Sequence, residues 1–158
     1  DFEYAGVVKH RPMTLVFAKE NNADAIKEAL LDRRTVVYSG NQLIGEEKYL
    51  REIFNNSVSF STTKISATGR ERKYVQITNT SDVTYEFYFV SGDENVQVLK
   101  KFELPAGKTI MFSVRATKDN ISVTGMKKFN YVVNNLLVAP NKGMNIEFEF
   151  DMNIEPKK

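Results

Sequence analysis

The sequence predicts a mainly β protein that begins with an α/β segment. In the first 56 residues short apolar runs flank a helical period, whereas from Ser57 onward apolar and polar residues alternate one by one. Turn residues then recur every ~8–12 positions, which is typical of a sandwich of about seven short strands. We therefore expect two domains, an α/β segment over residues 1–56 and an Ig-like antiparallel β-sandwich over residues 57–158. An open barrel is the competing architecture.

The α/β segment is expected to contain a strand, a helix and a second strand. Met13–Ala18 and Thr35–Tyr38 are almost wholly apolar, like strands that are buried on both faces. Asn22 is a suitable N-cap for a helix over residues 23–33. The apolar stripe of this helix consists of Ala23, Ile26, Ala29 and Leu30. The short links between the three elements predict a βαβ unit, with parallel strands and a right-handed crossover.

A second helix is predicted over residues 46–55. Its apolar stripe consists of Tyr49, Leu50, Ile53 and Phe54. A lone βαβ unit leaves two strand edges unpaired, and such edges tend to find partners. We therefore expect residues 13–38 to pack against the sandwich or to pair with a second copy, which makes a homo-oligomer one of the expected assemblies.

The alternation of apolar and polar residues defines the strands of the sandwich. The expected strands cover residues 58–62, 72–78, 85–89, 110–115, 121–123, 129–139 and 146–150. Asn134 and Asn135 tolerate a positive φ and could split the longest strand at a tight hairpin, but we expect one continuous strand. Asn141–Gly143 is predicted to be a hairpin loop. The sequence has no cysteine and no tryptophan, so the disulfide and the buried tryptophan of antibody domains are missing.

The composition excludes several functions. Lys and Arg number 22 against 20 Asp and Glu, so the net charge of +2 gives no electrostatic basis for binding nucleic acid. Without cysteine there is no disulfide framework, no thiolate zinc site and no cysteine nucleophile. No apolar run approaches the ~20 residues of a membrane-spanning helix. The absence of cysteine leaves the compartment open, because secreted proteins can also lack it. We expect a periplasmic or secreted location, with the cytoplasm as the alternative.

The single histidine, His10, offers little basis for catalysis. It lies between Lys9 and Arg11, and neighbouring cations lower the pKa of an imidazole. This environment suits neither a metal-binding pair nor a serine–histidine dyad, which needs a carboxylate to orient the base. We therefore interpret His10 as a structural or surface residue.

The acidic residues do not form a convincing site either. Glu147 and Glu149 alternate with aromatic residues on one strand, which is typical of a solvated face and not of the paired acids of a glycosidase. The loops around Asp93 and Asp119 carry oxygen ligands but lack the spacing of a 12-residue calcium loop. We interpret both aspartates as turn residues and expect this chain to hold no metal or other cofactor.

Two basic clusters lie next to aromatic residues. Residues 69–73 precede Tyr74, and residues 126–128 precede Phe129, a combination that can bind single-stranded nucleic acid. Both clusters are predicted at hairpin ends, where charge protects strand termini, so we expect no nucleic-acid partner. Gly40–Gln42 follows a buried strand. We interpret it as a turn in preference to a ligand-binding loop, because no glycine-rich phosphate loop is present.

Four segments of the N-terminal part resemble a known family. They are His10–Glu20 (HRPMTLVFAKE), Ile26–Leu30 (IKEAL), Arg33–Tyr38 (RRTVVY) and Asn41–Gly45 (NQLIG). Together they resemble the carboxy-terminal part of bacterial PHP-type (polymerase and histidinol phosphatase) metal-dependent phosphoesterases, over about residues 1–55. The resemblance implies that residues 1–56 are the end of a barrel and that a β-rich domain follows it.

The same resemblance implies where the catalytic groups of such a protein would lie. The family uses an H-x-H motif, further histidine and acidic ligands and a late D-x-H motif, none of which occurs in this sequence. The late D-x-H would fall just upstream of Asp1, so divalent metal ions are implied for a longer parent protein and no ligand can be assigned here. Residues 39–44 would follow a barrel strand on the side where barrels place their active sites, which makes Asn41 the candidate substrate-binding residue.

We therefore expect the non-catalytic C-terminal region of a PHP-type phosphoesterase, with an N-terminal catalytic domain as its partner and the sandwich as an accessory and interaction module. The alternative is a stand-alone cell-envelope module that binds glycan or protein through the aromatic residues of Tyr85–Phe89. An exposed aromatic strip would favour this alternative, and buried aromatic residues would count against it. A third hypothesis, an unrecognised small enzyme, is disfavoured because the usual acid–base groups are missing.

Overall fold

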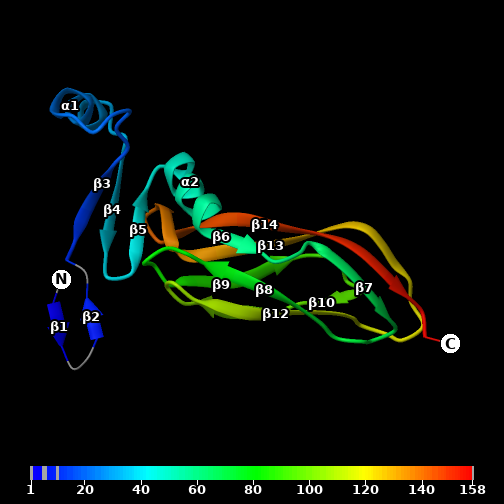
Figure 1. Ribbon diagram of the computed structural model, residues 1–158. Coiled ribbons are helices and arrows are strands. Elements are labelled where there is room, and N and C mark those ends of the chain that lie inside the picture. The colour runs from blue at the N-terminus through cyan, green and yellow to red at the C-terminus, as the bar shows by residue number, and fades with distance from the viewer. Residues whose placement is uncertain (1, 5–6, 10, 158) are drawn as a thin grey trace. The chain divides into compact units, whose positions relative to one another are not determined.

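The computed structural model describes residues 2–4, 7–9 and 11–157, with side chains from Arg11 onward (Figure 1). The chain divides into two compact units. The N-terminal unit comprises residues 1–55 and 135–144, and the sandwich unit comprises residues 56–134 and 145–158. The sequence did not indicate that residues 135–144 belong with the N-terminal residues.

The N-terminal unit contains short strands and two helices. Its elements are β1 (Phe2–Tyr4), β2 (Val7–Lys9), β3 (Met13–Val16), α1 (Ala23–Leu31), β4 (Thr35–Ser39), β5 (Gln42–Gly45) and most of α2 (Glu47–Ser57). β1 and β2 form a separate antiparallel pair. β3, β4 and β5 are neighbours in one sheet, in which β5 also pairs with the last residues of β13 (Val123–Ala139). We call this arrangement the N-terminal sheet.

The predicted βαβ unit is wrong, because β3 and β4 are antiparallel. A parallel crossover must carry the chain back along the full length of the strand before the next strand starts. Here the chain returns to the end of β3 that it has just left, since the amide of Phe17 donates to the carbonyl of Arg34 at 2.9 Å. The segment is therefore a long hairpin with α1 in its connection, and it is not a strand pair of a parallel barrel.

The two helices form where the sequence predicted them, but α1 buries less than expected. The side chain of Asn22 caps α1 by accepting from the amide of Ala25 at 2.8 Å, as predicted. Of the predicted stripe only Ala29 is buried, while Ile26 and Leu30 remain 37% and 50% exposed. In α2 the predicted stripe is confirmed, because Leu50 and Phe54 are buried.

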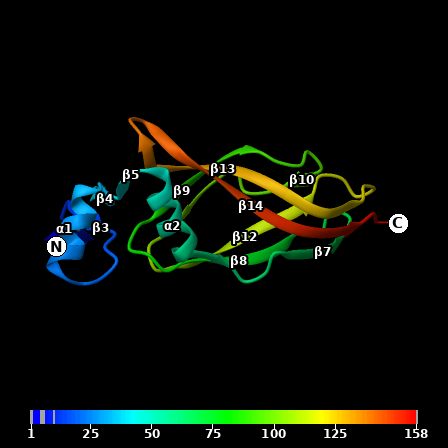
Figure 2. The ribbon, with the colours of Figure 1, turned by 90° about the horizontal axis from the view of Figure 1, so that it is seen from above.

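The sandwich unit consists of two sheets, as predicted. Its first strands are β6 (Val58–Phe60), β7 (Lys64–Thr68), β8 (Lys73–Asn79), β9 (Tyr85–Ser91), β10 (Val96–Gln97), β11 (Lys101–Leu104) and β12 (Thr109–Ala116). One sheet has the order β10-β12-β8-β6, and the other joins β11, β9, β13, β14 (Lys142–Glu155) and β7. β14 lies beside β13 in both views (Figure 2). The pair β7–β14 is parallel, so the predicted antiparallel sandwich holds with this exception.

The longest strand is continuous through the two adjacent asparagines, as expected. β13 starts at Val123, so the short strand predicted over residues 121–123 is its beginning, and it continues to Ala139. A register shift beside Asn130 accommodates this length against β9. The turn to β14 falls at Pro140–Asn141, slightly earlier than the predicted loop, and Asn141 adopts a φ of 57° there.

Aromatic rings fill the space between the two sheets of the sandwich. Phe112 of one sheet stacks on Phe150 of the other, with ring centroids 5.8 Å apart. Phe87 stacks on Phe102 at 4.4 Å, and Tyr131 is buried while its hydroxyl donates to the carbonyl of Leu99 at 2.7 Å. Aromatic contacts of this kind stabilise a core beyond the area that they bury.

One buried amide organises the turns at an end of the sandwich. Asn79 is 1% exposed, and its Nδ2 donates to the carbonyls of Val83 and Leu104 at 2.8 and 3.1 Å. Its Oδ1 accepts from the amide of Ser81 at 2.9 Å and from the Ser81 hydroxyl at 2.7 Å. A single side chain thus satisfies backbone groups of two separate connections, which buried polar groups require.

Replacement of Asn79 by alanine should destabilise the sandwich. Asn79→Ala leaves several buried carbonyl and amide groups without partners, so we expect the free energy of unfolding to fall by about 2–3 kcal/mol. Chemical denaturation measures this change. The matched control is Asn153→Ala at an exposed position of β14, where we expect a change within about 0.5 kcal/mol. Equal effects of the two substitutions would contradict the role of Asn79.

Candidate functional site

The residues that the structure describes contain no group of three or more histidine and acidic side chains that could hold a metal ion. His10 lies outside the described residues, so its predicted structural role stays a prediction. No helix in the described part of the chain is long and apolar enough to span a membrane.

Asn41 lies in a tight turn and not in the loop after a barrel strand. It follows Gly40 between the antiparallel strands β4 and β5, and both turn residues have positive φ values, 57° and 64°. These values are typical of a type I′ hairpin turn, which favours glycine and asparagine. The carbonyl of Asn41 accepts from Nδ2 of the buried Asn135 at 2.7 Å. The turn is thus accounted for by backbone geometry, and a substrate contact of Asn41 stays a prediction.

Glu147 and Glu149 lie on one exposed face of β14, as the sequence indicated. Nζ of Lys128 lies between them, 2.7 Å from Glu147 and 2.8 Å from Glu149. The hydrogen bond from Lys128 lowers the pKa of Glu149. A general acid needs a raised pKa, so this arrangement favours a solvated ion-pair cluster and not the paired acids of a glycosidase.

Asp93 and Asp119 act in turns, as interpreted from the sequence. Asp93 accepts from the amide of Asn95 at 2.9 Å and forms an ion pair with Lys127 at 2.8 Å. Asp119 accepts from the amide of Arg70 at 2.9 Å. Each carboxylate therefore has a partner within the protein.

The basic cluster 126–128 does not lie at a hairpin end, which corrects the prediction. Its residues are inside β13, where Lys127 and Lys128 form the ion pairs with acidic residues described above. The cluster 69–73 is not at a hairpin end either, because it connects β7 to the start of β8 and these strands belong to different sheets; Lys73 contacts Glu71 at 2.6 Å. Acidic neighbours offset these cations, which weakens any attraction for phosphate groups.

The aromatic residues of Tyr85–Phe89 do not form an exposed strip. Tyr85 and Phe87 are fully buried, and Tyr88 is the most exposed of the four at 37%. Nζ of Lys101 lies 4.9 Å from the Tyr88 ring centroid. A glycan platform needs several coplanar exposed rings, so this pattern counts against the glycan-binding alternative.

An apolar surface lies on the N-terminal sheet, within the part of the chain that the structure describes. Cross-strand pairing places Thr14 opposite Val37, Val37 opposite Ile44, and Ile44 opposite Leu137. We call these four residues the outer row. Val37 and Ile44 are each 41% exposed, and none of the four is buried. The sequence indicated apolar strands buried on both faces, but it gave no sign that one face would be open.

The opposite face of the same sheet is covered. Val36, Leu43 and Leu136, which alternate with the outer row along β4, β5 and β13, are buried to 1% exposure or less. Phe17 continues this side of β3, and its ring stacks on Tyr49 of α2 with centroids 4.8 Å apart. Helix α2 therefore packs on the inner face, whereas the outer row keeps a substantial exposure among the described residues.

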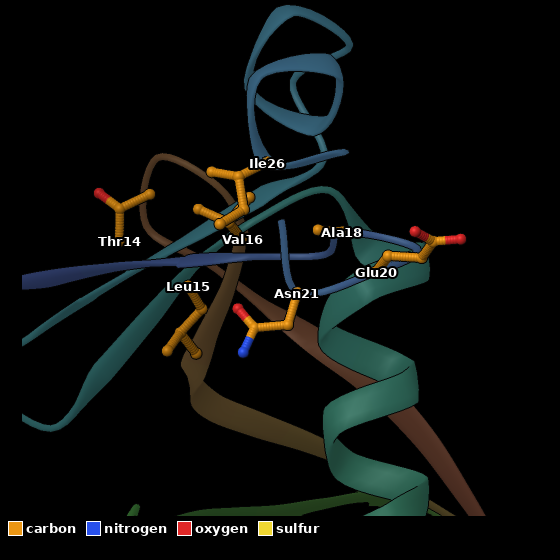
Figure 3. A pocket seen from close by; sticks show the side chains of 7 residues that line it. All are labelled: Thr14, Leu15, Val16, Ala18, Glu20, Asn21 and Ile26. Atoms are coloured by element: carbon orange, nitrogen blue, oxygen red, sulfur yellow. The ribbon is translucent and has the colours of Figure 1, made fainter. Parts of the chain in front are cut away.

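Two shallow hollows mark the outer face. One lies at β3 and the start of α1, where Thr14, Val16 and Ile26 lie on one side of the strand and Leu15 points to the other (Figure 3). The second is lined by Ile44 and Leu137 together with Pro140. Both hollows include residues of the outer row, and the first lies at the edge strand β3, because Leu15 lines it from the other side.

The two facing sheets, with β6 and β7 at their edges, define the sandwich unit as Ig-like in class. The chain belongs to the DUF5001 family, described as an Ig-like domain, whose model matches residues 58–149. The match begins after α2, so β3, α1, β4 and β5 lie outside it. No curated protein matches the chain.

Among solved structures, the chain is similar to a two-domain protein from Bacteroides vulgatus that contains a predicted PHP-like metal-dependent phosphoesterase. The two share 28% identity with a TM-score of 0.78, over 90% of this chain and 39% of that one. The chain thus spans well under half of the length of this solved relative. The sequence resemblance to PHP-type phosphoesterases and this structural similarity point to the same class of protein.

Two other solved structures match more weakly. WR4, a member of the MSP family from C. elegans, shares 12% identity over 64% of this chain and 98% of its own, with a TM-score of 0.43. The Escherichia coli alpha-2-macroglobulin segment from domain MG7 to the C-terminus shares 16% identity over 63% of this chain and 16% of its own, with a TM-score of 0.36.

The Asp93–Lys127 pair should stabilise the protein at neutral but not at acid pH. The hydrogen bond from Lys127 lowers the pKa of Asp93, so its contribution is present above the pKa of the unfolded state and is lost as the pH falls through the lower, folded pKa. We expect Asp93→Asn to reduce the free energy of unfolding at pH 7 by no more than about 1 kcal/mol. Urea denaturation should show a smaller difference at pH 2.5 than at pH 7. The same loss at both pH values would contradict this assignment.

Proposed function

We propose that this chain is the non-catalytic C-terminal region of a PHP-type metal-dependent phosphoesterase, with the Ig-like sandwich as an accessory and interaction module. The catalytic groups would lie in a preceding domain of the same polypeptide, which would also hold the divalent metal ions. This proposal assigns to the chain a role in supporting that domain and not in the chemistry itself.

The similarity to the Bacteroides vulgatus protein carries the proposal. It extends over 90% of this chain and therefore includes residues outside the Ig-like family match. A likeness confined to the sandwich would support only a shared fold, because Ig-like sandwiches serve many unrelated functions. The added likeness in the N-terminal residues supports a relationship to that two-domain protein that goes beyond a shared sandwich fold.

The chemistry of the described residues agrees with a non-catalytic role. They contain no candidate metal cluster, and the paired acids Glu147 and Glu149 are held by Lys128 on an open face. A hydrolase of phosphate esters needs a metal or a cluster of cations to stabilise the transition-state charge. In the proposed protein those groups belong to the other domain.

The alternative function, a stand-alone envelope module for glycan or protein, has less support. It requires an exposed recognition surface on the sandwich, whereas the described rings of that unit are mostly buried in its core. A periplasmic or secreted location is compatible with both functions and remains part of the proposal.

The full-length product of the gene that encodes this chain tests the proposed function. We expect that product to contain a D-x-H motif upstream of Asp1, to bind metal stoichiometrically and to hydrolyse a phosphate ester such as p-nitrophenyl phosphate or its diester. Chelation should abolish this activity. The 158-residue chain alone should bind substoichiometric metal and show no hydrolysis. Stoichiometric metal together with activity in the 158-residue chain would contradict the proposal.

A further inference from the structure

The outer face of the N-terminal sheet has the character of a buried surface. Its central positions are the outer row, in which Val37, Ile44 and Leu137 lie side by side across three strands. At the β3 edge, Val16 and the 37% exposed Ile26 of α1 extend the apolar area on the same side as Thr14 (Figure 3). The apolar surface is therefore contiguous across the sheet and onto a helix.

The centre of this face also lacks charge, unlike a true solvent face of the same protein. By strand alternation it further carries Thr35, Ser39 and Gln42, none of them ionisable. The exposed side of β14 instead carries Asn145, Glu147, Glu149, Asp151, Asn153 and Glu155. Depletion of charge at a partly exposed apolar face is characteristic of the centre of a stable interface.

We propose that the outer face of the N-terminal sheet is the docking surface for a metal-dependent phosphoesterase domain of the same polypeptide. This inference rests on the proposed function, and it adds which surface of the chain the catalytic domain contacts. The domain supplies the second layer that the sheet lacks, with Val37, Ile44 and Leu137 at the centre of the contact.

The comparisons point to this occupant. The Ig-like family match covers residues 58–149 and includes the end of β13, but it leaves β3, β4 and β5 outside, so these three strands are not a standard part of the Ig-like module. Only a tenth of this chain lies outside the match to the Bacteroides vulgatus protein, so most of the N-terminal unit recurs there. That two-domain protein contains a predicted PHP-like metal-dependent phosphoesterase, and 61% of its chain lies outside the match.

The borders of the face fit a polar rim. Glu20 lines the hollow at β3, and Glu46 lines the hollow at Ile44. Near them, Lys19 pairs with Glu28 at 3.0 Å, and Lys48 pairs with Glu46 at 2.9 Å. An apolar centre with charged residues at its borders is the usual anatomy of a protein interface.

Hydroxyl-radical footprinting of the full-length product and of the 158-residue chain tests this inference. We expect the labelling of Val37 and Ile44 to fall several-fold in the full-length product. The matched control is Val90, which is 58% exposed on β9 of the sandwich unit and should be labelled equally in both proteins.

Substitutions supply a second readout. Val37→Thr combined with Ile44→Thr should lower the Tm of the full-length product, because polar groups would enter the contact. The same pair should lower the Tm of the 158-residue chain much less, since there the two side chains are already 41% exposed. Val90→Thr should have the same effect in both proteins.

The outcomes separate this inference from the proposed function. If the full-length product is a metal-dependent phosphoesterase but the labelling of Val37 and Ile44 is unchanged, the docking surface is wrong and the proposed function stands. If the full-length product contains no phosphoesterase, both are wrong. If the 158-residue chain forms a dimer by sedimentation and the double substitution disrupts it, the face binds a second copy and the inference is overturned.

Discussion

Every β-sheet has two faces, and an apolar face is stable only when another layer removes it from water. In the sandwich unit each sheet covers the other, and rings such as Phe112 and Phe150 interlock between them. In the N-terminal unit α2 covers one face of the sheet, while Val37 and Ile44 on the other face stay 41% exposed. Covering the rest of such a side chain would contribute on the order of 1 kcal/mol each. The apolar faces of the sandwich unit are therefore covered, whereas the outer face of the N-terminal sheet remains partly exposed.

This difference in burial distinguishes the two units. The sandwich unit closes its own core and binds its buried polar groups internally, as Asn79 shows by joining two connections through its amide. The N-terminal sheet is the part whose composition demands a further layer, and its strands β3, β4 and β5 lie outside the Ig-like family match.

Local signals in the sequence predicted most elements, and long-range pairing accounts for the errors. The cap at Asn22, helix α2, the alternating strands and the continuity of β13 through Asn134–Asn135 all depend on nearby residues. The direction of β4 relative to β3 depends on where the chain returns after α1, which apolar runs do not encode. The exposure of the outer face could not be predicted for a related reason. A strand that is apolar on both sides needs a packing layer on each face, but its sequence does not show whether both layers are present.

Amide hydrogen exchange of the 158-residue chain tests the central claim most directly, namely that the sandwich unit covers its apolar sheet faces whereas the N-terminal sheet leaves one face partly exposed. The account predicts lower opening free energies for the amides of Val36 and Leu43 in the N-terminal sheet than for those of Val75 and Phe112 in the sandwich unit, although all four side chains are buried. Equal protection of the two sets would contradict it, because a sheet that is as stable as the closed sandwich would need no further layer.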